Sequence, residues 1–67
     1  MASYKSRLDK GGVMASIYNS NNVRVDVDVT DKYGFYEFKN LVTGPYLIKF
    51  YGMGFSSDDS INVSIVD

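Results

Sequence analysis

Residues 30–50 read TDKYGFYEFKNLVTGPYLIKF, and this stretch decides the fold. Asp31 and Gly34 mark a turn, because an aspartate carboxylate accepts hydrogen bonds from the backbone two residues on and glycine adopts positive φ without strain. Two stretches in which apolar residues alternate follow, 35–39 and 46–50, with a second turn between them. A turn, a strand, a turn and a strand in one unbroken pattern predict antiparallel β-structure.

The alternation also predicts which side chains face the core, because successive residues of a strand point to opposite faces. The inward set is Tyr36, Phe38, Tyr46, Ile48 and Phe50. We expect Leu41 to close one end of this core. If the two strands form a hairpin, Glu37 faces Lys49 on the outer side of the sheet. Phe35 then faces Tyr51 there.

The same period of two appears in three flanking segments, 13–17, 23–29 and 61–65, which we predict to be strands. The first two are joined by Asn19-Ser20-Asn21-Asn22, a sequence typical of a hairpin turn. We expect the valines of 23–29 on its half-buried face and Asp26 and Asp28 on its solvent face. Helical periodicity is absent, so the sequence predicts an all-β fold of about six strands.

Size and composition limit what this fold can do. The chain has 67 residues, a net charge of −1, no Cys and no His. A single core of this size gives only about 3–5 kcal/mol of net stability, and neither disulfides nor zinc can add to it here. The remaining source of additional stability is self-association or docking to a partner.

The residue types present also exclude several functions. Without His or Cys, and without a motif of paired carboxylates, we predict that the chain is not an enzyme and holds no cofactor. Asp26 and Asp28, or Asp58 and Asp59, lack the ligand number of a calcium site, so no metal is expected. The near-neutral charge argues against a nucleic-acid partner. No apolar stretch reaches the ~20 residues of a membrane span, and residues 1–10 do not form a signal peptide.

Three motifs resemble a known group of domains. They are Gly12-Val13, Thr30-Asp31-x-x-Gly34-x-Tyr36-x-Phe38-x-Asn40-Leu41 and Gly44-x-Tyr46-x-Ile48-x-Phe50. Together they resemble the B-type repeats of staphylococcal Sdr adhesins and the related carboxypeptidase-regulatory-like, prealbumin-like and collagen-adhesin B-type domains. The resemblance implies a small Ig-like or prealbumin-like antiparallel β-sandwich that serves as a spacer, stalk unit or binding module.

The chain departs from that group in its first residues and in its core. Only residues 1–11 precede the first motif, and they are expected to form an N-terminal arm or a short edge strand beside a sandwich of residues 12–67. If they form an arm, the family's first strand is missing and one sheet edge is open. The acidic calcium loop of the Sdr repeats is also absent. Phe50 replaces the Glu that promotes an isopeptide cross-link in collagen-adhesin domains, so we expect no cross-link.

Exposed aromatic residues are the best candidates for a contact surface, because a core this small cannot hold all of them. The candidates are Tyr33, Phe35, Tyr51, Met53 and Phe55. An equally good interpretation is that Phe55 caps the core and Tyr51 merely covers Phe35. The sequence thus predicts a non-enzymatic structural or interaction module of an extracellular or virion assembly, such as a phage tail fibre or capsid. It would act by homo-oligomerisation or protein docking. The alternative is a carbohydrate-binding or host-adhesion module in which loop aromatics stack on sugar rings.

Overall fold

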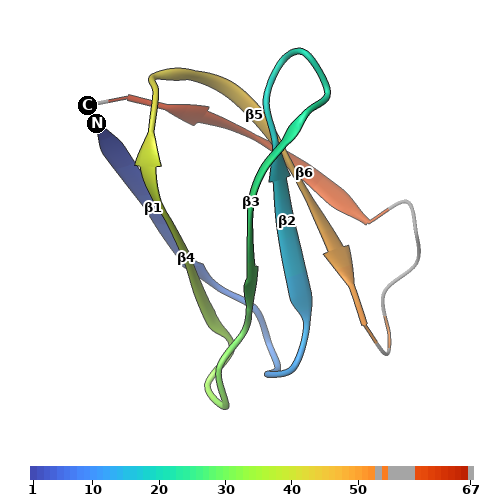
Figure 1. The fold of residues 1–67 in the computed structure, drawn as a ribbon. Coiled ribbons are helices and arrows are strands. Elements are labelled where there is room, and N and C mark those ends of the chain that lie inside the picture. Colours follow the sequence, from blue (N-terminus) through green and yellow to red (C-terminus); the bar gives the residue numbers. More distant parts are fainter. Residues whose placement is uncertain (53, 55–58, 67) are drawn as a thin grey trace.

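The chain forms a β-sandwich of two antiparallel sheets, described here from a computed structural model that covers residues 1–52, 54 and 59–66 (Figure 1). This part of the chain contains six strands and no helix. The strands are β1 (Ala2–Arg7), β2 (Met14–Tyr18), β3 (Arg24–Val29), β4 (Phe35–Leu41), β5 (Gly44–Tyr51) and β6 (Ser60–Ile65). The prediction of a small all-β sandwich is confirmed.

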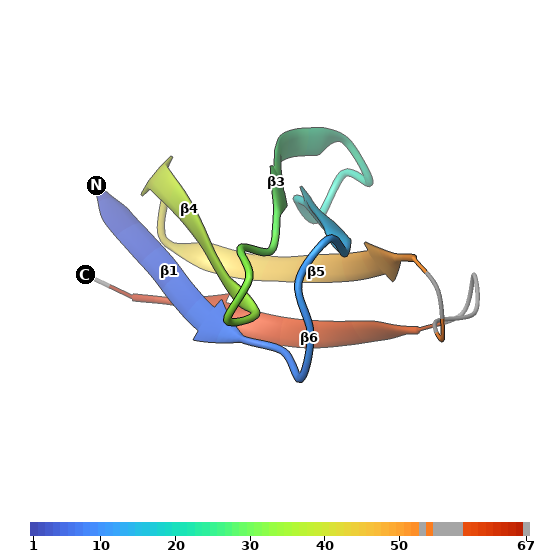
Figure 2. The same cartoon turned by 90° about the horizontal axis from the view of Figure 1, so that it is seen from below.

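The two sheets differ in size. The smaller sheet is the pair β1–β4, and the larger one has the order β3-β2-β5-β6. Seen from below, the β1–β4 pair runs obliquely to β5 and β6 of the larger sheet (Figure 2). Of the first eleven residues, 2–7 thus form a strand that pairs with β4, with Tyr4 opposite Phe38 and Ser6 opposite Tyr36.

The predicted hairpin between the fourth and fifth strands is wrong. β4 and β5 are consecutive but belong to different sheets, so the structure lacks both predicted cross-strand pairs, Glu37–Lys49 and Phe35–Tyr51. Glu37 lies opposite Lys5 of β1, and Phe35 lies opposite Arg7. The periodicity of a strand predicts its buried face, but it carries no information on which strand lies beside it.

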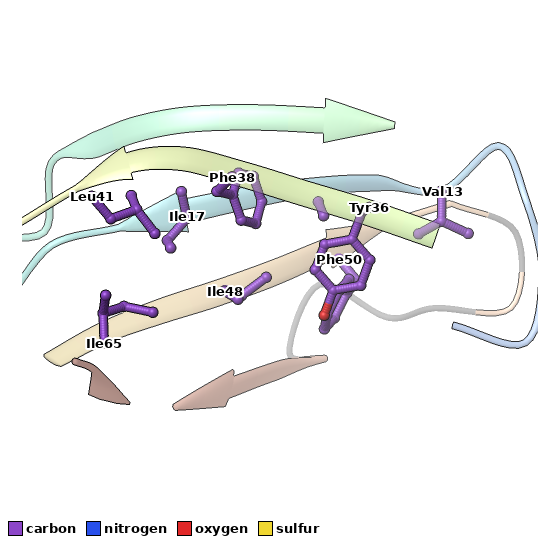
Figure 3. Packing of buried hydrophobic residues seen from close by; sticks show 9 residues of the cluster. Val13, Ile17, Tyr36, Phe38, Leu41, Ile48, Phe50 and Ile65 are labelled. Carbon is purple, nitrogen blue, oxygen red and sulfur yellow. The ribbon is translucent and has the colours of Figure 1, made fainter. Parts of the chain in front are cut away.

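The core lies between the two sheets, and Figure 3 shows its side chains pointing into the space between β4 and β5. The buried hydrophobic residues are Val13, Ala15, Ile17, Tyr36, Phe38, Leu41, Ile48, Phe50 and Ile65. Tyr36 is its aromatic centre, with ring centroids 5.8 Å from Phe38 and 5.7 Å from Phe50 in edge-to-face geometry. All inward residues predicted from residues 30–50 are buried except Tyr46, which is half-buried and packs against the core.

Two of the three predicted turns are closed by the polar side chains on which the predictions depend. Asn19 Oδ1 accepts hydrogen bonds from the backbone N–H groups of Asn21 and Val23, which closes the β2–β3 hairpin. Asp31 Oδ1 accepts from the N–H of Tyr33 at 2.8 Å and of Phe35 at 3.1 Å. Local carboxylate and amide caps therefore hold both reversals.

Candidate functional site

Strand β3 turns its hydrophobic side toward solvent, which reverses the predicted orientation. The exposed fractions are 55% for Val23, 45% for Val25, 42% for Val27 and 55% for Val29. The register explains the reversal, because Asp28 lies opposite the buried Ala15 and Asp26 opposite the buried Ile17. Residues directly opposite each other share a face of the sheet. The two acids therefore lie on the inner side of the sheet, and the prediction of inward valines is wrong.

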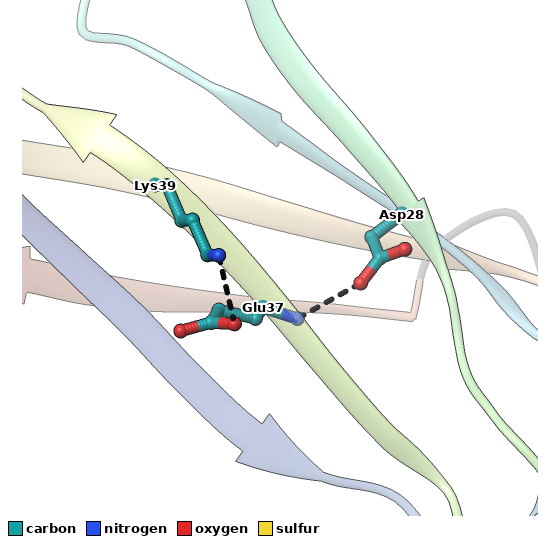
Figure 4. A network of polar contacts seen from close by, with 3 residues as sticks. All are labelled: Asp28, Glu37 and Lys39. Atoms are coloured by element: carbon teal, nitrogen blue, oxygen red, sulfur yellow. Dashed lines mark hydrogen bonds and ion pairs between the residues drawn. The ribbon is translucent and has the colours of Figure 1, made fainter.

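The inner side of β3 faces an open seam beside β4, and Asp28 bridges that seam. Its Oδ2 accepts a hydrogen bond from the backbone N–H of Glu37 in β4 at 2.9 Å (Figure 4). Its Oδ1 accepts from the N–H of Val29 at 2.9 Å. No backbone hydrogen bond joins β3 to β4 within the described ranges. A carboxylate thus substitutes for a ladder between these strands.

The edge of β3 has its outward N–H groups occupied. The N–H of Thr30 points toward β2, because it donates to the carbonyl of Val13. Backbone N–H groups alternate in direction along a strand, so those of the odd-numbered residues of β3 point away from β2. Asp26 Oδ1 accepts the N–H of Val27 at 2.8 Å, as Asp28 does for Val29. These two donors are therefore not available to an added strand, which is a recognised way to protect an edge.

Apolar side chains of β2, β3 and β5 gather on the outer side of the larger sheet, and we call this surface the valine face. The adjoining strand β6 presents Ser60, Asn62 and Ser64 on the same side. Three residues of β2 mark its rows. Met14 lies between Val29 and Tyr51, Ser16 lies between Val27 and Lys49, and Tyr18 lies beside Leu47. The valine face is defined as Met14, Ser16, Tyr18, Arg24, Val27, Val29, Leu47, Lys49 and Tyr51. Arg24 lies opposite Tyr18, and it and Lys49 are the charged residues of this set. An apolar sheet surface of this kind is typical of a contact surface.

Two tyrosines cover the middle of the valine face. A hydrogen bond with Tyr18 raises the pKa of Tyr51, with a smaller contribution from desolvation. Lys49 Nζ lies 5.1 Å from the centroid of the Tyr18 ring. Ser16 is fully buried, and its Oγ has no hydrogen-bond partner within the described residues. The tyrosine pair and Lys49 thus form an ordered polar centre of the valine face.

The outer side of the smaller sheet has a different character, and we call it the basic face. It comprises Lys5 and Arg7 of β1, Phe35, Glu37 and Lys39 of β4, and Lys32 and Tyr33 of the preceding turn. Lys5 Nζ lies 5.5 Å and Arg7 Cζ lies 5.4 Å from the centroid of the Phe35 ring. Lys32 Nζ lies 5.1 Å from that of Tyr33. Cations therefore accompany both exposed aromatic rings of this face.

A cavity of about 330 Å³ adjoins the basic face along the β3–β4 seam. It is lined by Lys5, Asp28, Val29, Asp31, Phe35, Tyr36 and Glu37. Its walls thus combine an exposed aromatic ring, a cation and three carboxylates. A second cavity of about 300 Å³ lies at the other end of the seam, between Val25 and Val42.

The predicted aromatic contact residues do not form one surface. Tyr33 is 59% exposed and Phe35 is 39% exposed, and both belong to the basic face. Tyr51 lies on the valine face of the other sheet, so it does not cover Phe35. Met53 and Phe55 lie outside the described residues. Sequence reasoning did not identify the valines of β3 or the cations of β1 as contact residues. The Val-Asp alternation of β3 and the Lys-Ser-Arg spacing of β1 each place like residues on one face of a strand. The sequence does not show which of these faces is exposed.

Burial also affects Tyr36 at the core. Desolvation, reinforced by Tyr4 and partly offset by a hydrogen bond with Ser6, raises the pKa of Tyr36 to about 12. In the unfolded chain this hydroxyl ionises near its ordinary pKa of about 10. Its contribution to stability is therefore complete below pH about 10 and is lost as the pH rises toward 12. We expect a loss of up to about 2 kcal/mol from this group alone.

Urea unfolding at pH about 9 and about 11 tests this expectation. The free energy of unfolding should fall more in the wild type than in Tyr36→Phe, which lacks the hydroxyl but keeps the ring packed in the core. Equal declines in the two proteins would show that Tyr36 does not titrate differently in the folded and unfolded states.

In residues 1–52, 54 and 59–66 no group of three or more His, Cys, Asp or Glu side chains is arranged to hold a metal ion. The same part of the chain has no helix that is long and apolar enough to cross a membrane. Comparison with protein-family models, with curated proteins and with solved structures finds no match. The two faces and the seam are therefore the basis for assigning a function.

Proposed function

We propose that this protein is a non-enzymatic assembly module that associates with a second copy of itself through the valine face. The observation that supports this most is the row of exposed valines on β3, with Val27 and Val29 beside Met14 and two tyrosines. Hydrophobic patches of this kind on small domains usually mark contact surfaces. The core has nine buried hydrophobic residues in the described part of the chain and leaves little intrinsic stability, so burial of this face would add stability that the chain lacks.

Several features favour face-to-face packing of two copies over addition of strands at the β3 edge. The N–H groups of Val27 and Val29 are already occupied by carboxylates, which disfavours edge pairing. The molecule measures 30 × 22 × 14 Å, so its broad side is comparable in scale with the about 800 Å² that each partner buries in a standard interface.

Symmetry also supports a second copy as the occupant. A twofold axis that lays β3 of one copy over β5 of the other would place the valines against Leu47 and Tyr51. The same patch on both subunits would then be complementary to itself.

The setting that we propose for this assembly is an extracellular surface or a virion. Its support is the sequence resemblance to adhesin repeats and prealbumin-like domains, which serve as spacers and stalk units. A stalk or capsid component requires stable contacts rather than a reaction, and the surface features above suit such contacts.

A charge placed in the valine face is expected to prevent association. Val27→Lys would put an ammonium group at the centre of the interface, on the other side of Ser16 from Lys49. Burying an unpaired charge strongly disfavours a complex. The melting temperature of the wild type should rise with protein concentration by mass action, whereas that of Val27→Lys should not.

Val42→Lys is the matched control, because Val42 is 63% exposed but lies in the β4–β5 turn, outside the valine face. It should retain the concentration dependence of the wild type. The proposal fails if Val27→Lys retains that dependence, or if both variants lose it equally.

A further inference from the structure

The basic face concentrates positive charge on a chain whose net charge is slightly negative. Lys5, Arg7, Lys32 and Lys39 are four of the seven cations of the chain. The face holds one acid, Glu37, whose Oε1 lies 4.0 Å from Lys39 Nζ. Asp28 and Asp31 line the cavity that adjoins the face. The four cations outnumber Glu37 and these two acids, so the face attracts anions although the whole molecule does not.

Arg7 is held in a fixed position at the centre of this face. Its Nε donates to the carbonyl oxygen of Tyr33 at 2.9 Å. The guanidinium lies over Phe35 together with Lys5, and within the described residues its terminal N–H groups make no hydrogen bond and remain for a ligand. A guanidinium fixed in this way loses little entropy on binding and matches the geometry of a carboxylate.

The exposed ring of Phe35 supplies a surface for a second part of the same ligand. It is 39% exposed at the mouth of the cavity along the β3–β4 seam. The C–H groups of a sugar ring carry small positive charges, and they pack well on the negative face of an aromatic ring. A sugar that carries a carboxylate would therefore contact both Phe35 and the cations.

The cavity beside Phe35 distinguishes a sugar from a nucleic acid. Asp28, Asp31 and Glu37 line it, and the carboxylates of Asp28 and Asp31 each already accept two backbone N–H groups. Their oxygens have further lone pairs that can accept sugar hydroxyls. The phosphodiester chain of DNA offers no hydroxyl donors to these oxygens, so it could not satisfy them as a sugar does.

We propose that the basic face binds acidic sugars, in particular uronic acid residues of a polysaccharide, with the carboxylate on Arg7 and Lys5 and the sugar ring on Phe35. This site lies on the other sheet from the valine face and does not depend on self-association. It also differs from the alternative predicted from the loop aromatics, which relied on Tyr51 and Phe55.

The test is a titration of the ¹⁵N-labelled protein with an oligogalacturonate, followed by amide chemical shifts. We expect saturable shifts that centre on β1 and β4, and the methyl-esterified form of the same oligosaccharide, which lacks the charge, should bind at least about tenfold more weakly. Phe35→Ala and Lys5→Gln should each weaken binding by about tenfold. Tyr51→Ala, on the valine face, should leave it unchanged.

Three results would overturn the proposal. Absence of saturable shifts would mean that the face does not bind acidic sugars. Equal binding of the esterified form would show that the carboxylate is not recognised. Binding of an oligothymidylate as tight as that of the oligogalacturonate would show that the face attracts any polyanion. Amide spectra of Phe35→Ala and Lys5→Gln verify that each variant remains folded. The two replacements are chemically unrelated, so a folding defect in one variant leaves the other informative.

Discussion

Gly34→Ala is expected to destabilise the protein by more than about 3 kcal/mol, which is close to the whole stability of a domain of this size. Gly34 has a φ of +91°, a conformation that L side chains rarely adopt. An added Cβ would also lie 2.1 Å from the carbonyl oxygen of Leu8. The backbone of Leu8 cannot move away easily, because its N–H donates a hydrogen bond to the carbonyl of Gly34 at 2.8 Å. The clash therefore separates the end of β1 from the β3–β4 turn.

Gly12→Ala separates the steric effect from the conformational one. Gly12 has a similar φ of +76°, but no atom lies within 4 Å of its notional Cβ. This variant should lose only about 1–2 kcal/mol, the cost of a positive φ in a non-glycine residue. Urea unfolding of both variants provides the comparison. Equal losses would mean that the backbone contact between Gly34 and Leu8 is not as close as the structure has it.

Asp28→Ala is expected to have the second-largest effect, a loss of about 2–3 kcal/mol. Both carboxylate oxygens of Asp28 accept backbone N–H groups, from Val29 and from Glu37. The bond to Glu37 is partly buried and connects the two sheets, so its loss leaves a donor without a partner at the seam. Hydrogen bonds to an ionised acceptor are about twice as strong as neutral ones.

Asp26→Ala is the matched control, because Asp26 lies on the same strand and caps one exposed N–H, that of Val27. We expect a loss below about 1 kcal/mol for it. If the free energies of unfolding of the two variants fall equally, Asp28 does not bridge β3 and β4. A denaturant slope that differs between the variants would show instead that the folded state of one of them is no longer compact.

The sequence contains enough information for the elements and most of the core, but not for their assembly. In β2, β4 and β5 the alternation predicts the buried face, because those strands lie over the core and one side must be apolar. The Asn19 and Asp31 turns are equally readable, since each depends on a side chain capping its own backbone. The sheet to which each strand belongs depends on distant partners, and the local pattern of residues 30–50 predicted a hairpin that does not form.

The reversed orientation of β3 was unpredictable from periodicity for a specific reason. Valines at alternate positions indicate a buried side when the strand lies over a core. The inner side of β3 instead borders the seam beside β4. At that seam the N–H of Glu37 needs an acceptor, and Asp28 supplies it better than a valine could. A non-local hydrogen bond thus determines which side of the strand faces solvent.

The same lack of non-local information affected the contact residues. Tyr33 and Phe35 are exposed as predicted, but Tyr51 belongs to the opposite side of the molecule because β4 and β5 lie in different sheets. The cations that accompany Phe35 come from β1, a segment for which the sequence left open whether it is an arm or a strand. Once β1 pairs with β4, Lys5 and Arg7 are placed beside the aromatic ring by register alone.

The solution mass of the purified protein, measured by light scattering on a sizing column over a wide concentration range, tests the central claim most directly. We predict that a dimer forms as the concentration rises, and that Val27→Lys remains a monomer of 7.5 kDa throughout while Val42→Lys behaves like the wild type. A wild-type protein that remains a folded monomer at every concentration would contradict self-association through the valine face.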